Sequence, residues 1–214
     1  MSARELPPLP RVDYQYPTAG GRDGCIAIIG EAPGNEEVRQ GIPFAGMSGR
    51  LLNRNLEQVG LDRHACLIAN VFRFQPPGNK VGHFFCSRTR ARKEGLSLAE
   101  ELGPFGTSDY CIADYRGEVE ALRRTLEDIR PKAILALGRT PTWALTGQNG
   151  ITRLRGQVLP CRFLPEIPVV PTWHPSYILR GNWSEEATFR SDIDLARRCA
   201  EGPVPSDRAS GPVA

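Results

Sequence analysis

The stretch CIAIIGEAPGNEEVRQGIPFAGMSG, residues 25–49, sets the expected fold. Its apolar run Cys25–Ile29 predicts a buried strand. Ser48, which we interpret as an N-cap, begins a helical pattern that continues to Val59 and stops at Gly60. The segment between strand and helix is rich in glycine, proline and acidic residues, and it is too long for a simple turn. We therefore expect it to carry a binding site.

Strand-like and helix-like patterns alternate along the remaining chain. Further strands are predicted at Cys66–Phe72, Ala133–Leu137 and Val169–Trp173. Further helices are predicted at Gly117–Ile129, Arg139–Leu145 and Ser184–Ala200. Because strands that alternate with helices form parallel sheets covered on both faces, the pattern predicts an α/β fold with three α/β/α layers.

Unusual loops follow three of the predicted strands. They read GEAPG at 30–34, QPPGNKVGH at 75–83 and WHPSYILR at 173–180. In an open α/β sheet, ligands bind outside the carboxyl ends of the strands. Three such loops on one rim of the sheet predict one shared site.

The domain organisation follows from length and composition. The chain has 214 residues, of which 40% are hydrophobic and 24% charged, as is ordinary for one globular domain. We place this domain at 23–203, between a Pro-rich arm at 1–22 and a flexible tail at 204–214. Within it, residues 78–110 form a long basic stretch without regular pattern, which we interpret as a lid or a nucleic-acid-contacting insertion.

Several classes of protein are disfavoured by composition. The sequence lacks the roughly 18 to 20 consecutive apolar residues of a membrane helix and the apolar core of a signal peptide, so we expect a cytoplasmic protein without a membrane partner. Six dispersed cysteines without a CxxC pair suggest neither a zinc site nor disulfides. A net charge of +3 suits a polyanionic partner and an ordinary mixed surface equally. No nucleotide-binding GxGxxG or GxxxxGK[ST] motif follows a strand.

Six segments in order resemble the uracil-DNA glycosylase superfamily, most closely its family 4. They are GEAPGNEE, GIPFAGMSGRLL, IANVFRFQPPGN, RPKAILALG, LRG and WHPSYILR, and they extend from about Cys25 to the last predicted helix. The resemblance implies a four-stranded parallel sheet between helices. It also implies hydrolysis of the bond between uracil and deoxyribose in DNA, which releases uracil and leaves an abasic site. We expect a monomer that requires no cofactor or metal.

The resemblance assigns three side chains to the uracil ring. Phe44 matches the stacking residue, a contact worth roughly 1–3 kcal/mol, although a Phe there also suits a core. Asn70 matches the selector, because an amide answers the N3 donor and O4 acceptor that cytosine reverses; the alternative is a strand-end cap. His174 matches the donor to O2, where negative charge develops, although a single His is often structural.

Acidic residues near the sugar are assigned less directly. Glu31 is the acidic residue nearest the expected sugar, and a carboxylate there would orient water or stabilise a cationic sugar. In other branches of the superfamily the water-activating residue stands one place later than Glu31. This chain has Ala32 at that place, as family 4 proteins have alanine. Ala32 is expected to contact uracil. Glu37 also matches a family acid, and a charge at a helix start is the alternative.

Contacts to the DNA backbone are implied on both sides of the extruded base. Backbone amides and small side chains are expected from Pro33, Gly34, Ser48 and Ser176. Candidates for phosphate contacts are Arg153, Arg155 and Arg180. Candidates to fill the vacated base stack are Tyr177 and Ile178.

The chain departs from family 4 at the iron–sulfur cluster. The family resemblance implies four cysteines: a CxxC pair near the start, one in KCRPPGN and one in the helix before RPK. This chain has Phe74 and Glu118 at the last two places and no cysteine before Cys25. Because such a cluster needs its thiolates, we predict no cluster and expect Phe74 and the arm to fill the volume.

A rival interpretation concerns His83, in the segment GNKVGH. This segment resembles the basic, His-containing loop of a branch that traps deoxyribose covalently. His83 would then attack the sugar carbon, and the protein would bind uracil-DNA reversibly or covalently with little turnover. A loop histidine without a chemical role is the alternative.

Overall fold

The computed structural model describes residues 9–21 and 24–202, and its centre is a five-stranded sheet in the order β2-β1-β5-β7-β6. Four strands are parallel: β1 (Ile26–Gly30), β2 (Cys66–Asn70), β5 (Ala133–Leu137) and β7 (Pro168–Thr172). The fifth, β6 (Leu159–Pro160), is an antiparallel edge strand of two residues. The predicted parallel sheet is therefore present, and β6 extends it. Two residues are too few to form a recognisable sequence pattern.

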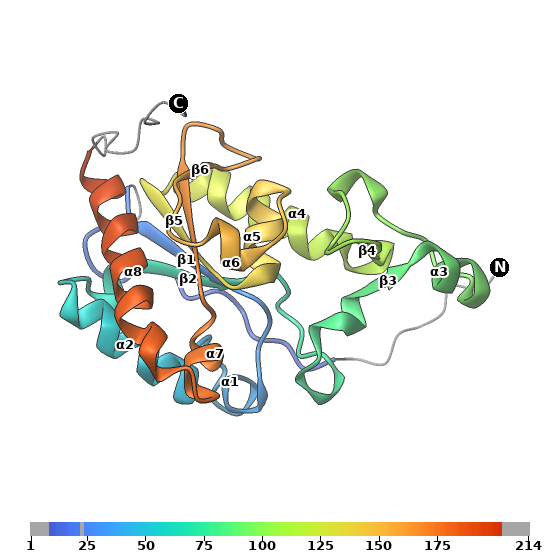
Figure 1. Ribbon diagram of the computed structural model, residues 1–214, viewed down its shortest axis with the longest axis horizontal. Helices are drawn as coiled ribbons and strands as arrows, with labels where there is room; N and C mark the ends of the chain where they lie inside the picture. The colour runs from blue at the N-terminus through green and yellow to red at the C-terminus, as the bar shows by residue number, and fades with distance from the viewer. Residues whose placement is uncertain (1–8, 22–23, 203–214) are drawn as a thin grey trace, which may run out of the picture.

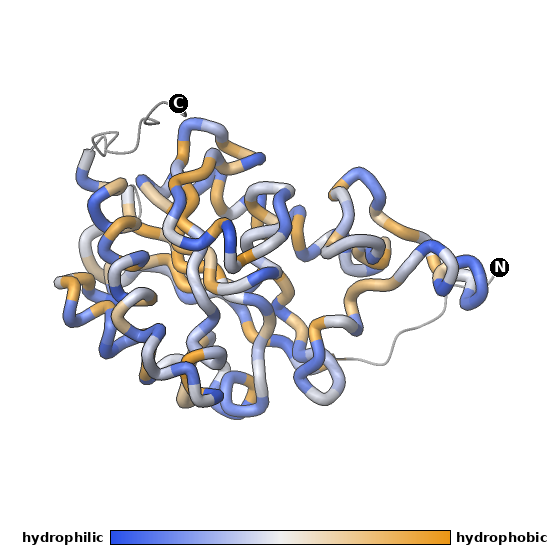
Figure 2. The backbone as a smooth tube through the Cα atoms, in the orientation of Figure 1, coloured by the Kyte–Doolittle hydropathy of each residue, from blue (hydrophilic) through white to orange (hydrophobic). Residues whose placement is uncertain are grey.

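Helices cover both faces of this sheet, which confirms the α/β/α layers. Alternate residues of β1 point to opposite faces. Ile26 and Ile28 pack in one core cluster with residues of α2 (Met47–Gln58) and α8 (Glu186–Glu201). Ala27 and Ile29 pack in the other with residues of α4 (Arg116–Ile129) and α5 (Arg139–Thr146). The layers are visible in Figure 1, and the hydrophobic colour of the central strands in Figure 2.

The remaining helices are short. They are α1 (Asn35–Gln40), α3 (Arg88–Glu94), α6 (Ile151–Leu154) and α7 (Pro175–Leu179). Single 3-10 turns lie at Arg63–Ala65, Pro77–Asn79, Val81–Phe84, Glu100–Leu102, Ala113–Tyr115 and Trp183–Glu185. The longer predicted elements agree with the structure within two residues at each end. The N-cap assigned to Ser48 is wrong, because α2 begins at Met47 and Gly46 is its N-cap.

The described part of the N-terminal arm lies along the edge strand β2. Gln15 pairs with Ile68 as an antiparallel bridge, and the Val12 amide donates to the Arg73 carbonyl at 2.8 Å. Val12 is also buried in the core. An edge strand presents unpaired backbone groups, so the arm satisfies part of this edge. The tail expected at 204–214 lies outside the described residues.

The stretch at 78–110 is not irregular. It contains an antiparallel pair, β3 (Phe85–Ser87) and β4 (Asp109–Cys111), with α3 between them, and it extends away from the sheet in Figure 1. Phe85 stacks on Phe105 at 4.1 Å and meets Trp143 of α5 edge-on at 5.2 Å. Aromatic packing therefore fastens the insertion to the domain. Within 9–21 and 24–202, no helix is long and apolar enough to cross a membrane.

Candidate active site

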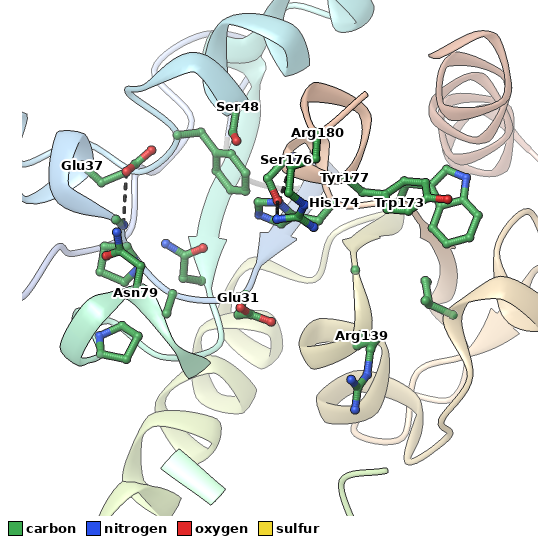
Figure 3. Close-up of a pocket in the computed structure, with 18 of the residues that line it drawn as sticks. Glu31, Glu37, Ser48, Asn79, Arg139, Trp173, His174, Ser176, Tyr177 and Arg180 are labelled. Atoms are coloured by element: carbon green, nitrogen blue, oxygen red, sulfur yellow. Dashed lines mark hydrogen bonds between the residues drawn. The ribbon is translucent and has the colours of Figure 1, made fainter. Parts of the chain in front are cut away.

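A cavity of about 610 Å³ opens at the carboxyl ends of the parallel strands. Its walls come from the loops after β1, β2, β5 and β7 and from the start of α2. The three loops expected to share one rim all contribute to it. Figure 3 shows Glu37 and Asn79 on one side of the cavity and His174, Ser176 and Arg180 on the other.

The side chains of Phe44 and Asn70 come from different segments of the chain. Both lie beside Gly30, the last residue of β1. Phe44 is 5% exposed and Asn70 is 4% exposed, and both line the cavity. A methyl group built on Gly30 would lie 2.5 Å from the Phe44 ring and would overlap the Asn70 side-chain oxygen. Only the missing side chain of Gly30 therefore lets ring and amide come this close.

The backbone of Phe44 is held in an unfavourable conformation. Its φ of 54° lies in the left-handed region, which non-glycine residues rarely adopt. Arg63 donates to the Pro43 carbonyl at 2.6 Å and to the Phe44 carbonyl at 3.4 Å. A side chain at Gly49 would overlap that same Phe44 carbonyl. Such strain persists only where surrounding contacts enforce it, and it is common at binding sites.

The Asn70 amide is available to a ligand. Asn70 ends β2 and pairs in register with Gly30, so its side chain stands at the rim of the sheet. Among the described residues, no hydrogen-bond partner of its side-chain amide is found. Its amide atoms are not among the buried unpaired atoms of the described residues, so they are open to the cavity, where a ligand with one donor and one acceptor would pair with both.

His174 presents a neutral ring to the cavity. It is the N-cap of α7, and its Nδ1 accepts from the Ser176 amide at 3.2 Å and contacts the Ser176 hydroxyl at 2.8 Å. Burial, aided by the charge of Arg180, lowers the His174 pKa to about 4. Because a nitrogen that accepts a backbone N–H carries no proton, the neutral ring is protonated on Nε2. The Phe44 and His174 ring centroids are 6.0 Å apart.

Glu31 lines the same cavity and is partly buried. Burial raises the pKa of its carboxyl group, against a hydrogen bond from Thr140 and the charges of Arg139 and Arg180. The Thr140 hydroxyl donates to Oε2 at 2.5 Å. Glu37, the other acidic candidate, accepts from the Gly34 amide at 3.1 Å and the Gly46 amide at 3.3 Å. It therefore ties the GEAPG loop to the GIPFAG loop.

The structure brings most of the other candidates to the cavity. Ala32, Pro33, Gly34, Ser48, Ser176, Tyr177 and Arg180 line it. Ile178 does not: it is fully buried in the core cluster, so its assignment to the base stack is wrong. Arg155 is also directed elsewhere, because its guanidinium pairs with Asp192 through bonds of 2.9 and 2.5 Å. Arg153 is exposed on α6, beside the cavity-lining Thr152.

His83 is not among the residues that line the cavity. Its Nε2 lies 2.8 Å from the Tyr115 hydroxyl, and its ring meets Phe84 edge-on. Burial, aided by the charge of Arg90, lowers the pKa of His83. The contacts of His83 are those of a structural residue of the insertion.

The residues at the family's cluster positions do not suit an iron–sulfur cluster. Glu118 is 7% exposed and accepts three hydrogen bonds from Arg73, at 2.8 to 2.9 Å. The Arg73 guanidinium lies 5.3 Å from the ring centre of Tyr14 in the arm. Phe74 packs against the core, as expected. An ion pair and two aromatic rings therefore occupy this region, whereas cluster ligation requires thiolates.

Several residues around the cavity were missed by the sequence analysis. Arg139 and Thr140 begin α5, one residue beyond the carboxyl end of β5, and the rule that ligands bind at such ends could have identified them. Trp173 also lines the cavity and stacks on Tyr177 with ring centres 4.6 Å apart. Arg63 gave no signal, because its contacts with Pro43 and Gln15 exist only in the folded chain.

Known proteins resemble this chain over most of its length. The family model described as the uracil DNA glycosylase superfamily matches residues 17–193. A type-4 uracil-DNA glycosylase of Thermotoga maritima is 33% identical over 181 residues, which cover 83% of this chain and 79% of the relative. The type-4 uracil-DNA glycosylase of Archaeoglobus fulgidus is 30% identical over 184 residues, 83% of this chain and 77% of the relative. The chain belongs to the uracil-DNA glycosylase superfamily.

Proposed function

We propose that this chain is a monofunctional uracil-DNA glycosylase of base excision repair. It would turn deoxyuridine out of DNA and hydrolyse the bond between base and sugar, giving uracil and an abasic site. The observation that carries the proposal is the convergence of Phe44, Asn70 and His174 on one cavity. A flat aromatic face, an amide with free donor and acceptor, and a neutral N–H donor together match the uracil ring.

Recognition of the base would rest on Phe44 and Asn70. The Phe44 ring stacks on the extruded pyrimidine, and its strained backbone keeps it in place before the DNA arrives. Asn70 accepts from N3–H and donates to O4. Cytosine offers the opposite polarity at both positions, so a cytosine would leave the buried amide unpaired.

Bond cleavage would rest on His174 and Glu31. As the C1′–N1 bond lengthens, negative charge moves to uracil O2, and the Nε2–H of His174 donates to it; such a donor is worth roughly 3–4 kcal/mol. The sugar becomes cationic, and the Glu31 carboxylate stabilises it or orients the attacking water. A neutral His174 suits this task, since its ring is held in the Nε2–H form by the Ser176 amide.

Pro33, Gly34, Ser48 and Ser176 are proposed to contact the DNA backbone, together with Arg180. Tyr177 is proposed to fill the vacated stack, for which it would have to leave Trp173. The reaction as proposed uses only side chains and water. Monomeric state and cytoplasmic location remain predictions.

The test is turnover on a uracil-containing oligonucleotide with substoichiometric protein. The proposal requires many abasic products per protein molecule. His174→Ala should lower kcat by about 10²- to 10³-fold while DNA affinity stays within a few-fold. His64→Ala is the matched control, because His64 is exposed and does not line the cavity. A normal kcat in His174→Ala would rule out the proposed role of this donor.

The same assay with excess protein addresses covalent trapping through His83. A trapping protein gives an SDS-resistant band, at most one product per molecule, and loses the band in His83→Ala. We expect no such band, because His83 is engaged with Tyr115 and lies outside the cavity lining.

A further inference from the structure

Thr140 joins two loops of the site through one hydrogen bond. Glu31 directly follows β1, and Thr140 is the second residue of α5, which begins just beyond β5. Thr140 is fully buried, and its Oγ1 lies 2.5 Å from Glu31 Oε2. An ionised carboxylate only accepts, so the hydroxyl proton must point to Glu31.

This hydrogen bond fixes one oxygen of the Glu31 carboxylate, Oε2, and leaves the other oxygen, Oε1, free. Among the described residues, Glu31 Oε1 has no hydrogen-bond partner, and it is not among the buried unpaired atoms. Glu31 lines the cavity, so Oε1 is open to that space. Figure 3 shows Glu31 between Asn79 and Arg139 in the view, below His174.

Thr140 also opposes the effect of burial on Glu31. Burial raises the carboxyl pKa, and the Thr140 hydrogen bond is the largest influence that lowers it. The positive charges of Arg139 and Arg180 act in the same direction as Thr140. Three other titratable groups line the cavity. They are His174, which is neutral above about pH 4, Glu37, whose oxygens face the Gly34 and Gly46 amides, and Tyr177, whose ring stacks on Trp173.

We propose that Thr140 is a positioning residue for the glycosylase reaction: its hydroxyl fixes the Glu31 carboxylate in ionised form, with Oε1 directed at the sugar and the attacking water. This inference rests on the proposed function. Thr140 touches neither base nor sugar in this scheme and acts only through Glu31. The ionised form matters because a protonated carboxyl group would neither balance a cationic sugar nor accept a proton from water.

The test compares pH profiles of kcat for wild type, Thr140→Val and Thr140→Ser. Valine keeps the shape and removes the donor, whereas serine retains it. A hydrogen bond to a charged group of this kind corresponds to about tenfold. In Thr140→Val we therefore expect kcat to fall about tenfold on the acid limb of the pH profile, where kcat declines as pH falls. On the alkaline plateau, kcat should stay within a factor of two of wild type. Thr140→Ser should restore the wild-type profile.

A matched control lies on the same helix. Thr142 is 1% exposed, and its hydroxyl donates to the Gly138 carbonyl at 2.7 Å. Thr142→Val therefore also loses a buried hydrogen bond, but its acid limb should remain where it is in wild type. Glu31→Gln, which cannot titrate, should lose the limb altogether. If Thr140→Val folds poorly, Thr140→Ala removes the same donor and is measured in its place.

Two results with the Thr140→Val variant would overturn the inference. One is a wild-type acid limb in Thr140→Val, and the other is an equal loss of kcat at every pH, as a purely structural role would produce. Persistence of the limb in Glu31→Gln would also overturn it, because another group would then be titrating. Failure of the proposed function is distinct: the wild-type protein would release no uracil at any pH.

Discussion

Replacement of Gly30 by alanine tests the geometry of the base pocket with a single methyl group. The new Cβ would stand 2.5 Å from Cζ of Phe44, whereas ordinary contacts begin near 3.4 Å. The ring would have to move by about 0.9 Å, the difference between these two distances. The Asn70 side-chain oxygen would be displaced at the same time. The methyl group would therefore occupy the space that the proposed recognition of the base requires.

The expected loss is much larger in activity than in stability. A displacement of about 1 Å in a positioned group can cost about 10²-fold in rate, so we expect kcat/KM for uracil-DNA to fall at least about 10²-fold. Gly30 does not have a positive φ, so alanine is compatible with its backbone. Overpacking costs about 1–3 kcal/mol, offset by about 0.4–1 kcal/mol from the less flexible unfolded chain. The free energy of unfolding should therefore fall by no more than about 2.6 kcal/mol.

The assay is steady-state uracil release from an oligonucleotide, combined with urea unfolding of the same preparations. Gly117→Ala is the matched control, because a Cβ at Gly117 meets nothing within 4 Å. This variant should keep wild-type activity. Wild-type kcat/KM in a folded Gly30→Ala protein would refute the reasoning, since it would mean that Phe44 and Asn70 can move apart without consequence for the base.

Three further predictions concern selectivity, stability and pH. Asn70→Asp should reduce the preference for uracil over cytosine by at least about tenfold, measured on paired oligonucleotides; unchanged preference would contradict the selector role. Glu118→Ala should lower the free energy of unfolding by about 3–5 kcal/mol in urea titrations, because it removes the buried partner of Arg73, whose side chain is 18% exposed, and leaves only the exposed Asp13 at 3.8 Å. The double variant Arg73→Met/Glu118→Leu should recover most of this loss. A mild effect of Glu118→Ala alone would argue against a stabilising role of the Arg73–Glu118 ion pair. Because the folded-state pKa of His174 is lowered from 6.5 to about 4, the unfolded chain binds the proton more readily, and stability should decline as pH falls from about 6.5 to 4. His174→Gln should remove that part of the decline, and identical pH–stability curves for the two proteins would contradict it.

The elements of the fold were predictable because they depend on local patterns. The runs at β1, β2, β5 and β7 are apolar on both faces, as strands buried between two helix layers must be. Chain order and the handedness of crossovers then place their carboxyl ends on one rim. Phe44, Asn70 and His174 stand in segments that adjoin this rim, so the sequence pointed to them through motif and position.

Other features required the coordinates, because they depend on contacts between distant segments and on side-chain direction. Ile178 and Arg155 have residue types suited to DNA, but packing buries one in the core and Asp192 engages the other. The insertion at 78–110 owes its order to Phe85, Phe105 and Trp143, which meet only after the chain has folded.

The sequence by itself determined the four parallel strands, the four longer helices and which three side chains could surround a pyrimidine, since these follow from apolar period and from motifs read along the chain. Only the tertiary structure decided how those side chains are supported. The hydrogen bond from Thr140 to Glu31 joins residues 109 positions apart in the sequence, and the ion pair of Arg73 with Glu118 joins residues 45 positions apart. The sequence around one residue of each pair does not indicate its partner, because hydrogen-bond geometry at such separations is set by the packing of whole layers.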